Sequence, residues 1–177
     1  MLESMDPRVA LARLAVAHAA ESGLPLEGSP PALADRIPAE PRACFVSLHD
    51  AQGNLRGCIG TLVPTRATLA EEILANAFAA ARRDPRFPPL EAAELAGLTV
   101  KVDVLGPLEP IRGLESLDPR RYGVVVTGPR GERGVLLPDL EGIDTVEGQV
   151  HIACRKAGLV WGQKGIALQR FTVERYV

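Results

Sequence analysis

The residues best suited to chemistry lie in one short stretch, residues 54–62, where Arg56 and Cys58 stand two positions apart. These polar residues alternate with the apolar Leu55 and Ile59, and a period of two is typical of a half-buried strand. On such a strand, Arg56 and Cys58 share one face. A guanidinium near a thiol favours the thiolate, which is the nucleophilic form of cysteine. The stretch therefore predicts a site with Cys58 as its reactive group and Arg56 as its anion anchor.

Two glycines in the same stretch, Gly57 and Gly60, need a reason, because glycine weakens a strand. They can leave room for a substrate and expose backbone amides, or they can permit tight packing. Cys58 also has two interpretations. It can be a nucleophile or redox thiol, or a small buried residue under a covering helix.

A hairpin is predicted to position Cys58. Residues 43–49 alternate as a strand, and residues 50–53 have the composition of a turn into the second strand. The apolar face of the hairpin is predicted to hold Cys44, Val46, Leu48, Leu55 and Ile59. The other face is predicted to hold Phe45, Ser47, His49, Asn54, Arg56 and Cys58. His49 is therefore the candidate base for Cys58, if the register brings the two together.

A second candidate group follows an alanine-rich helix predicted to end near Arg83. In the sequence Asp84-Pro85-Arg86-Phe87, proline stops the helix, and Asp84 and Arg86 can face a substrate pocket. The alternative is a helix stop with a local ion pair. His151 and Cys154 have a spacing that suits two metal ligands on a helix, but no third ligand is evident, so no metal is expected.

The remaining elements predict an α+β fold built on antiparallel sheets with flanking helices. A helix is expected from the Asp6-Pro7 cap to about Gly23, and another from Asp144 or Thr145 to Lys156, with Gly158 as its C-terminal glycine. Strands are expected at residues 98–105, 122–127, 134–137 and 168–176. Hairpins and short connections dominate, which does not favour a parallel doubly wound sheet.

Composition excludes several classes of function. The formal net charge is −2 and aromatic residues make up 4% of the 177 residues, which argues against nucleic-acid binding. The longest apolar stretch, residues 9–20, is too short to span a bilayer, and the acidic N-terminus lacks a signal-peptide layout, so a cytoplasmic protein is expected. Three cysteines without tight spacing argue against a disulfide framework, and no cofactor motif is evident.

The central stretch, residues 55–62, resembles the signature of the AMMECR-domain family, also called AmmeMemoRadiSam system protein A. Three further segments resemble that family's motifs in the same order. They are Asp84-Pro85-Arg86-Phe87, then Tyr122-Gly123-Val124 before a hairpin ending Val135-Leu136-Leu137-Pro138, and then Lys156-Ala157-Gly158-Leu159 followed by Trp161. The resemblance extends from about Ala43 to the C-terminus.

This resemblance implies one AMMECR-like domain over residues 1–177, with a larger α+β subdomain and a smaller one whose boundary the sequence does not give. It also implies an association with a Memo-type protein and a radical SAM enzyme. It implies no settled activity.

Two functions are consistent with these residues. The first is a cytoplasmic enzyme, or enzyme component, that binds a small molecule over the central strand, with Cys58 and His49 as catalytic residues. Arg56, Gly57, Gly60, Asp84 and Arg86 would then bind the substrate. The second is a non-catalytic module that docks a protein partner through the same surface. Catalysis needs a recessed pocket and a perturbed thiol, whereas docking tolerates Cys58→Ser.

Overall fold

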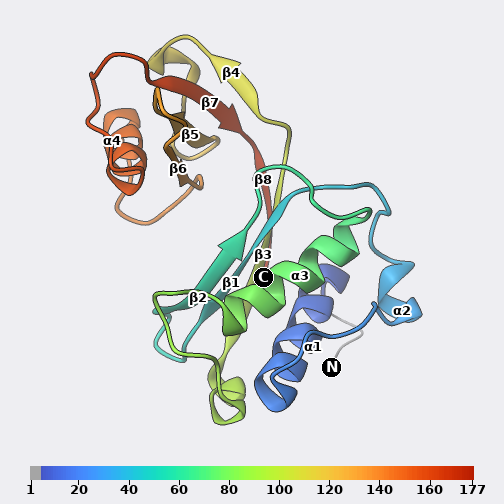
Figure 1. Cartoon of the computed structure of the whole chain (residues 1–177). Coiled ribbons are helices and arrows are strands. Elements are labelled where there is room, and N and C mark those ends of the chain that lie inside the picture. Colours follow the sequence, from blue (N-terminus) through green and yellow to red (C-terminus); the bar gives the residue numbers. More distant parts are fainter. Residues whose placement is uncertain (1–4) are drawn as a thin grey trace. The chain divides into compact units, whose positions relative to one another are not determined.

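The chain folds into two compact units, each with a four-stranded sheet (Figure 1). The computed structural model describes residues 5–177. The prediction about the layout of the N-terminal segment falls partly on residues 1–4, which lie outside the described residues. Unit 1 extends to Leu105 and also contains Glu174–Val177, whereas unit 2 is the continuous segment Gly106–Val173. The predicted α+β fold with antiparallel sheets is confirmed.

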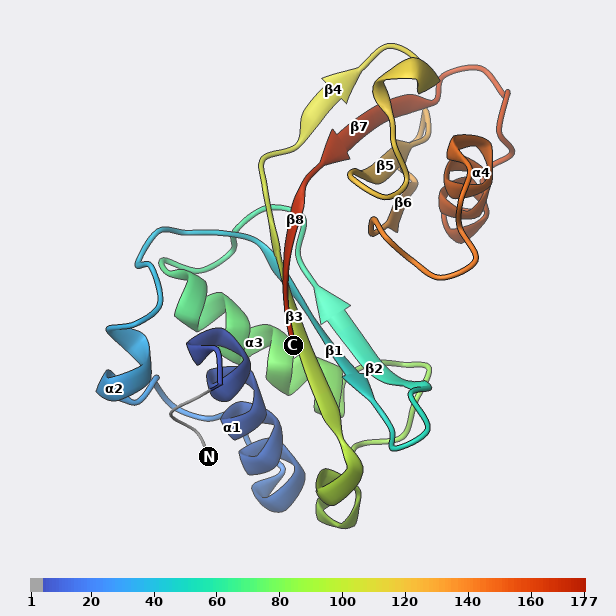
Figure 2. The same ribbon diagram turned by 180° about the vertical axis from the view of Figure 1, so that it is seen from behind.

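Unit 1 is built on sheet A, with the strand order β2-β1-β3-β8, and helices α1 and α3 cover one face of it (Figures 1 and 2). Helix α1 (Pro7–Ser22) begins at Asp6, whose carboxylate accepts the Arg8 N–H, and ends at Gly23 in the left-handed conformation. Both caps agree with the sequence. Helix α3 (Leu69–Arg82) begins at Thr68 with a capping box to Glu71. The short helix α2 (Pro31–Ala34) follows α1.

The hairpin of β1 (Cys44–His49) and β2 (Leu55–Gly60) places Cys58 on the predicted face with Ser47, and the register puts Ser47 directly opposite it. Beyond Leu48 the register shifts, so that His49 pairs with Leu55 and Arg56 is the extra residue of a bulge. The prediction that Leu55 lies on the apolar face is therefore wrong. An extra residue reverses the alternation, and Leu55 is 38% exposed.

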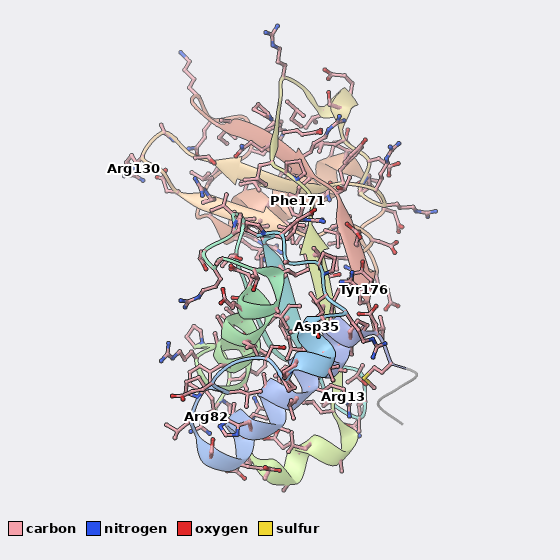
Figure 3. All side chains as sticks on the ribbon, turned by 90° about the vertical axis from the view of Figure 1, so that its right-hand side faces the viewer. Arg13, Asp35, Arg82, Arg130, Phe171 and Tyr176 are labelled. Carbon is pink, nitrogen blue, oxygen red and sulfur yellow. The ribbon has the colours of Figure 1, made fainter. Side chains whose placement is uncertain are left out.

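Sheet A is completed by β3 (Thr99–Leu105), which follows the 3-10 helix η2 (Ala92–Gly97), and by β8 (Val173–Tyr176). The Arg8 guanidinium lies 4.2 Å from the centre of the Tyr176 ring, which Figure 3 labels.

Apolar side chains from α1, α3 and the helix-facing side of the sheet form the core of unit 1. Its fully buried members include Leu11, Val16, Val46, Leu48, Ile73, Ala77 and Val102.

Unit 2 is built on sheet B, with the strand order β4-β7-β5-β6, against which α4 (Val146–Lys156) packs. Its strands are β4 (Glu109–Ile111), β5 (Gly123–Thr127), β6 (Arg133–Leu136) and β7 (Ala167–Phe171), and the 3-10 helix η3 (Leu114–Ser116) follows β4. The Thr145 side chain caps α4 by accepting the Gly148 N–H, and Gly158 has φ 70° just after the helix. These features agree with the sequence prediction.

Two predictions about strands need correction. Residues 168–176 are predicted as one strand, but they form β7 in sheet B and β8 in sheet A, separated at Thr172. Apolar and polar residues alternate through both strands, so the change of sheet leaves no trace in the sequence pattern. Residues 109–111, which have no predicted element, form the short strand β4 against β7.

Candidate functional site

Cys58 lies half-buried on β2, the edge strand of sheet A, and its neighbours come from two other strands. Ser47 of β1 pairs with Cys58 on one side and with Lys101 of β3 on the other. Residues directly opposite in a sheet share a face, so Cys58, Ser47 and Lys101 form a row across three strands. The strand neighbours of this row, Val46, Leu48 and Val102, are buried in the core with α1 and α3, so the row lies on the opposite face of the sheet.

The main chain of Cys58 is held by a pair of side chains that we call the Asp84–Arg86 clip. The Cys58 N–H donates to Asp84 Oδ2 at 2.9 Å, and Arg86 Nη2 donates to the Cys58 carbonyl oxygen at 3.3 Å. The two side chains also bind each other, at 2.9 Å from Arg86 Nε to Asp84 Oδ1 and at 2.7 Å from Arg86 Nη2 to Asp84 Oδ2. The backbone N–H and carbonyl oxygen of Cys58, which point away from β1, are therefore both hydrogen bonded to the clip.

The electrostatics of the clip favour both charges. The hydrogen bonds from Arg86 lower the pKa of Asp84 to about 2, with a smaller contribution from the Cys58 N–H, although burial opposes the shift. The hydrogen bond to Asp84 raises the pKa of Arg86, and the charged form of the Cys58 side chain is a further, smaller cause. Only 2% of the Asp84 side chain is exposed, against 53% for Arg86. The guanidinium thus has one side on the clip and the other in solvent.

Arg56 is held by a different acid. Its Nε donates to Glu94 Oε1 at 2.6 Å and its Nη2 to Glu94 Oε2 at 2.9 Å, a bidentate pair. Its Nη1 donates to the Pro88 carbonyl oxygen at 3.0 Å. Arg56 therefore ties the bulge of β2 to η2 and to the segment after α3. Its guanidinium already binds a carboxylate, so an anionic ligand would have to compete with Glu94.

His49 is hydrogen bonded through both ring nitrogens, at 3.3 Å from Nε2 to Ser47 Oγ and at 3.3 Å from Nδ1 to the Gly53 carbonyl oxygen. Since Ser47 lies opposite Cys58, the structure places His49, Ser47 and Cys58 as successive neighbours on one face. The register pairs His49 with Leu55 rather than with Cys58, so His49 is related to Cys58 through Ser47.

Both glycines of β2 have their missing side-chain space filled by protein atoms. A Cβ on Gly57 would overlap the Ala80 carbonyl oxygen of α3, and a Cβ on Gly60 would overlap the Phe45 ring. The packing interpretation that the sequence left open therefore accounts for Gly57, which is buried under α3. Glycine at these positions lets α3 and Phe45 approach the strand closely.

The other two cysteines occupy different environments. Burial raises the pKa of Cys44 to about 12, against a partly compensating hydrogen bond from Asn76. Burial also raises the pKa of Cys154, which packs in the core of unit 2. None of the three cysteines takes part in a disulfide. Within residues 5–177, no cluster of three or more side chains is arranged to hold a metal ion.

The sequence did not identify Lys101 or Glu94 as part of this region. Residues 98–105 alternate clearly enough to show that Lys101 opposes the buried valines, but its row with Ser47 depends on strand order. Glu94 is 38 residues from Arg56, and no local sequence pattern pairs them.

No helix among the described residues is long and apolar enough to cross a membrane.

Comparisons with known proteins agree on one family. The AMMECR1 family model matches residues 9–176. A Thermotoga maritima protein is 54% identical over 133 residues, which cover 75% of each chain. A longer Clostridium acetobutylicum protein is 40% identical over 174 residues, covering 98% of this chain but 36% of that protein. The crystal structure of an uncharacterized protein from Pyrococcus horikoshii has a TM-score of 0.82 and 32% identity, covering 98% of this chain and 90% of the other. The chain therefore belongs to the AMMECR1 family.

Proposed function

We propose that this AMMECR1-domain protein is an enzyme, or an enzyme component, that acts on a small molecule through the thiol of Cys58. The observation that carries the proposal is the Asp84–Arg86 clip, which binds both backbone groups of Cys58 and keeps a half-exposed guanidinium beside it. A fixed backbone restricts where the thiol can point, and a nearby cation favours its nucleophilic form.

The surrounding side chains have distinct roles in this proposal. The Cys58 sulfur forms a bond to an electrophilic carbon of the substrate, and the leaving group departs with the bonding electrons. The thiol proton passes to His49, whose Nε2 is hydrogen bonded to Ser47 opposite Cys58. Arg86, rather than Arg56, offers solvent-facing donors to an anionic group of the substrate. The guanidinium of Arg56 is already paired with the Glu94 carboxylate.

The test is the rate at which each cysteine of the folded protein is alkylated, read by peptide mass spectrometry over a range of pH. We expect Cys58 to react much faster than the buried Cys44 and Cys154, and to prefer iodoacetate over iodoacetamide more strongly than the unfolded chain does. Arg86→Ala should remove that preference, whereas Arg42→Ala, at a surface ion pair of the same unit, should not. If Cys58 is as unreactive as Cys44 until the protein unfolds, the thiol proposal is wrong.

A second candidate function is a docking module that uses the same surface. Strand β2 is an edge strand, and its first residue, Leu55, is 38% exposed, which suits an interaction with a protein partner. A Memo-type protein and a radical SAM enzyme are the partners proposed through the family resemblance. Docking should survive Cys58→Ser and be lost on Leu55→Asp, as measured by co-purification with each partner. Loss of activity in Cys58→Ser with docking intact would favour the enzyme.

A further inference from the structure

A second candidate site lies on the opposite side of sheet A, along α3. An open cavity of about 650 Å³ lies between this helix and the segments 25–28 and 65–67, all in unit 1. That volume is within the range of small-molecule sites, roughly 300–1,000 Å³. We call it the α3 groove. None of its lining residues is on β2, so the inference does not depend on the proposed role of Cys58.

The floor of the α3 groove is apolar. Leu74, Ala75 and Phe78 come from neighbouring turns of α3, and Leu26 lies on the opposite wall. Phe78 is half-buried and packs against the core of unit 1, so its ring is held in place rather than free to collapse into the groove. The floor can therefore receive an aromatic ring or a short alkyl chain.

Positive charge lies at both ends of this floor. Arg66 precedes α3 and Arg83 follows it, and a helix of 14 residues is about 21 Å long. The Arg83 guanidinium lies 4.9 Å from the centre of the Phe78 ring. The third charged residue in the lining is Glu71, whose Oε2 accepts the N–H groups of Ala67 and Thr68. The groove therefore has two guanidinium groups against one carboxylate that is already hydrogen bonded.

These two arginines differ from most others in unit 1. Among the described residues of that unit, arginine side chains generally bind a carboxylate or a backbone carbonyl. The described exceptions are Arg36, Arg66 and Arg83, which make no side-chain hydrogen bond or ion pair within residues 5–177. Two of these three line the same groove, and their donors are available to a ligand.

We propose that the α3 groove binds an organic anion with an apolar body, such as an aryl or alkyl carboxylate or phosphate. The apolar body packs on Leu74, Ala75 and Phe78, and the anionic group binds the guanidinium of Arg83 or Arg66. The carboxylate of Glu71 disfavours an anion placed at the centre of the groove, so the charge is held at an end.

The test uses two fluorescent probes with nearly the same aromatic body. Anilinonaphthalenesulfonate has an anionic group, and phenylnaphthylamine does not. We expect the folded protein to bind the anionic probe more tightly, and Arg66→Ala or Arg83→Ala to weaken that binding, about fivefold for the arginine that holds the sulfonate. Arg66→Ala, which leaves the contact of Arg83 with the Phe78 ring in place, should not change the affinity for the neutral probe. Arg36→Ala is the matched control, since Arg36 is exposed and unpaired but does not line the groove.

Ala75→Glu places a second carboxylate on the floor and should abolish binding of the anionic probe. Thermal unfolding of each variant checks that the fold is intact. The proposal is overturned if neither Arg66→Ala nor Arg83→Ala weakens binding more than Arg36→Ala does, or if both probes bind equally well. Cys58→Ser should leave probe binding unchanged, which separates a failure of this site from a failure of the Cys58 site.

Discussion

The two edge strands β2 and β6 share a local pattern and differ in one place. Strand β2 contains Arg56-Gly57-Cys58-Ile59, and β6 contains Arg133-Gly134-Val135-Leu136. In each, the glycine lies under a helix, so that a Cβ would overlap the carbonyl oxygen of Ala80 in α3 or of Ala153 in α4. The glycine is therefore a packing device common to both units.

The residue after the glycine is where the two strands differ. At β6, Lys156 Nζ donates to the Val135 carbonyl oxygen at 2.9 Å, from an exposed position. At β2, a buried carboxylate and a guanidinium together bind both backbone groups of Cys58. The glycine under a helix is common to the two strands and belongs to the packing of each unit. The thiol and the Asp84–Arg86 clip are present at β2 and not at β6, so they mark the candidate site.

The largest effect that tests this comparison is expected from Gly57→Ala and Gly134→Ala. Each substitution should lower the stability of its unit by about 3 kcal/mol, because helix backbone must move to accommodate the methyl group. Hydrogen exchange read by mass spectrometry can follow the two units separately. A small effect at only one glycine would show that the packing is not shared.

A slightly smaller loss, about 2 to 3 kcal/mol, is expected for Asp84→Asn. This change leaves Arg86 without its carboxylate and removes a charged acceptor from the Cys58 N–H. Urea unfolding gives the free energy, and alkylation of Cys58 in the same variant shows whether positioning is lost as well. Unchanged stability together with unchanged alkylation would mean that the clip does nothing for β2.

The clip should also make stability depend on acidic pH. The pKa of Asp84 is about 2 when folded, below its ordinary value of 3.8, so the folded state binds this proton more weakly than the unfolded state. Its contribution, about 2 kcal/mol, is complete above about pH 4 and is lost as the pH falls towards 2. Urea unfolding of the natural protein and Asp84→Asn at pH 5 and pH 2.5 isolates this contribution. Equal losses in both proteins would contradict it.

The smallest effect is expected at β6. Lys156→Gln should lower the free energy of unfolding by less than about 1 kcal/mol. The Lys156 ammonium is exposed, so its hydrogen bond to the Val135 carbonyl oxygen replaces one to water and adds little stability. Fluorescence of Trp161, the single tryptophan, reports on unit 2 during unfolding. A loss as large as that of Asp84→Asn would remove the distinction between the two edges.

The sequence predicted the features that depend on nearby residues. The caps at Asp6 and Gly23 and the shared face of Ser47 and Cys58 follow from local chemistry and alternation, and the structure confirms them. The bulge at Arg56 was not predicted, because alternation assumes one residue opposite each residue, and the Glu94 that binds the Arg56 guanidinium is far along the chain. Alternation over residues 168–176 predicts extended backbone, but it does not reveal the break at Thr172, because the two strands have pairing partners in different sheets.

The chain leaves unit 1 after β3 and returns to it only in β8, with Gly106 N–H donating to the Thr172 carbonyl oxygen where the two passages meet. Unit 2 is therefore inserted between two adjacent strands of sheet A, in the place of a hairpin loop. During synthesis, unit 2 emerges from the ribosome as one continuous segment and can fold before unit 1 is finished. The sheet that carries Cys58 is completed last, when Glu174, Arg175 and Tyr176 reach Arg42, Asp103 and Arg8.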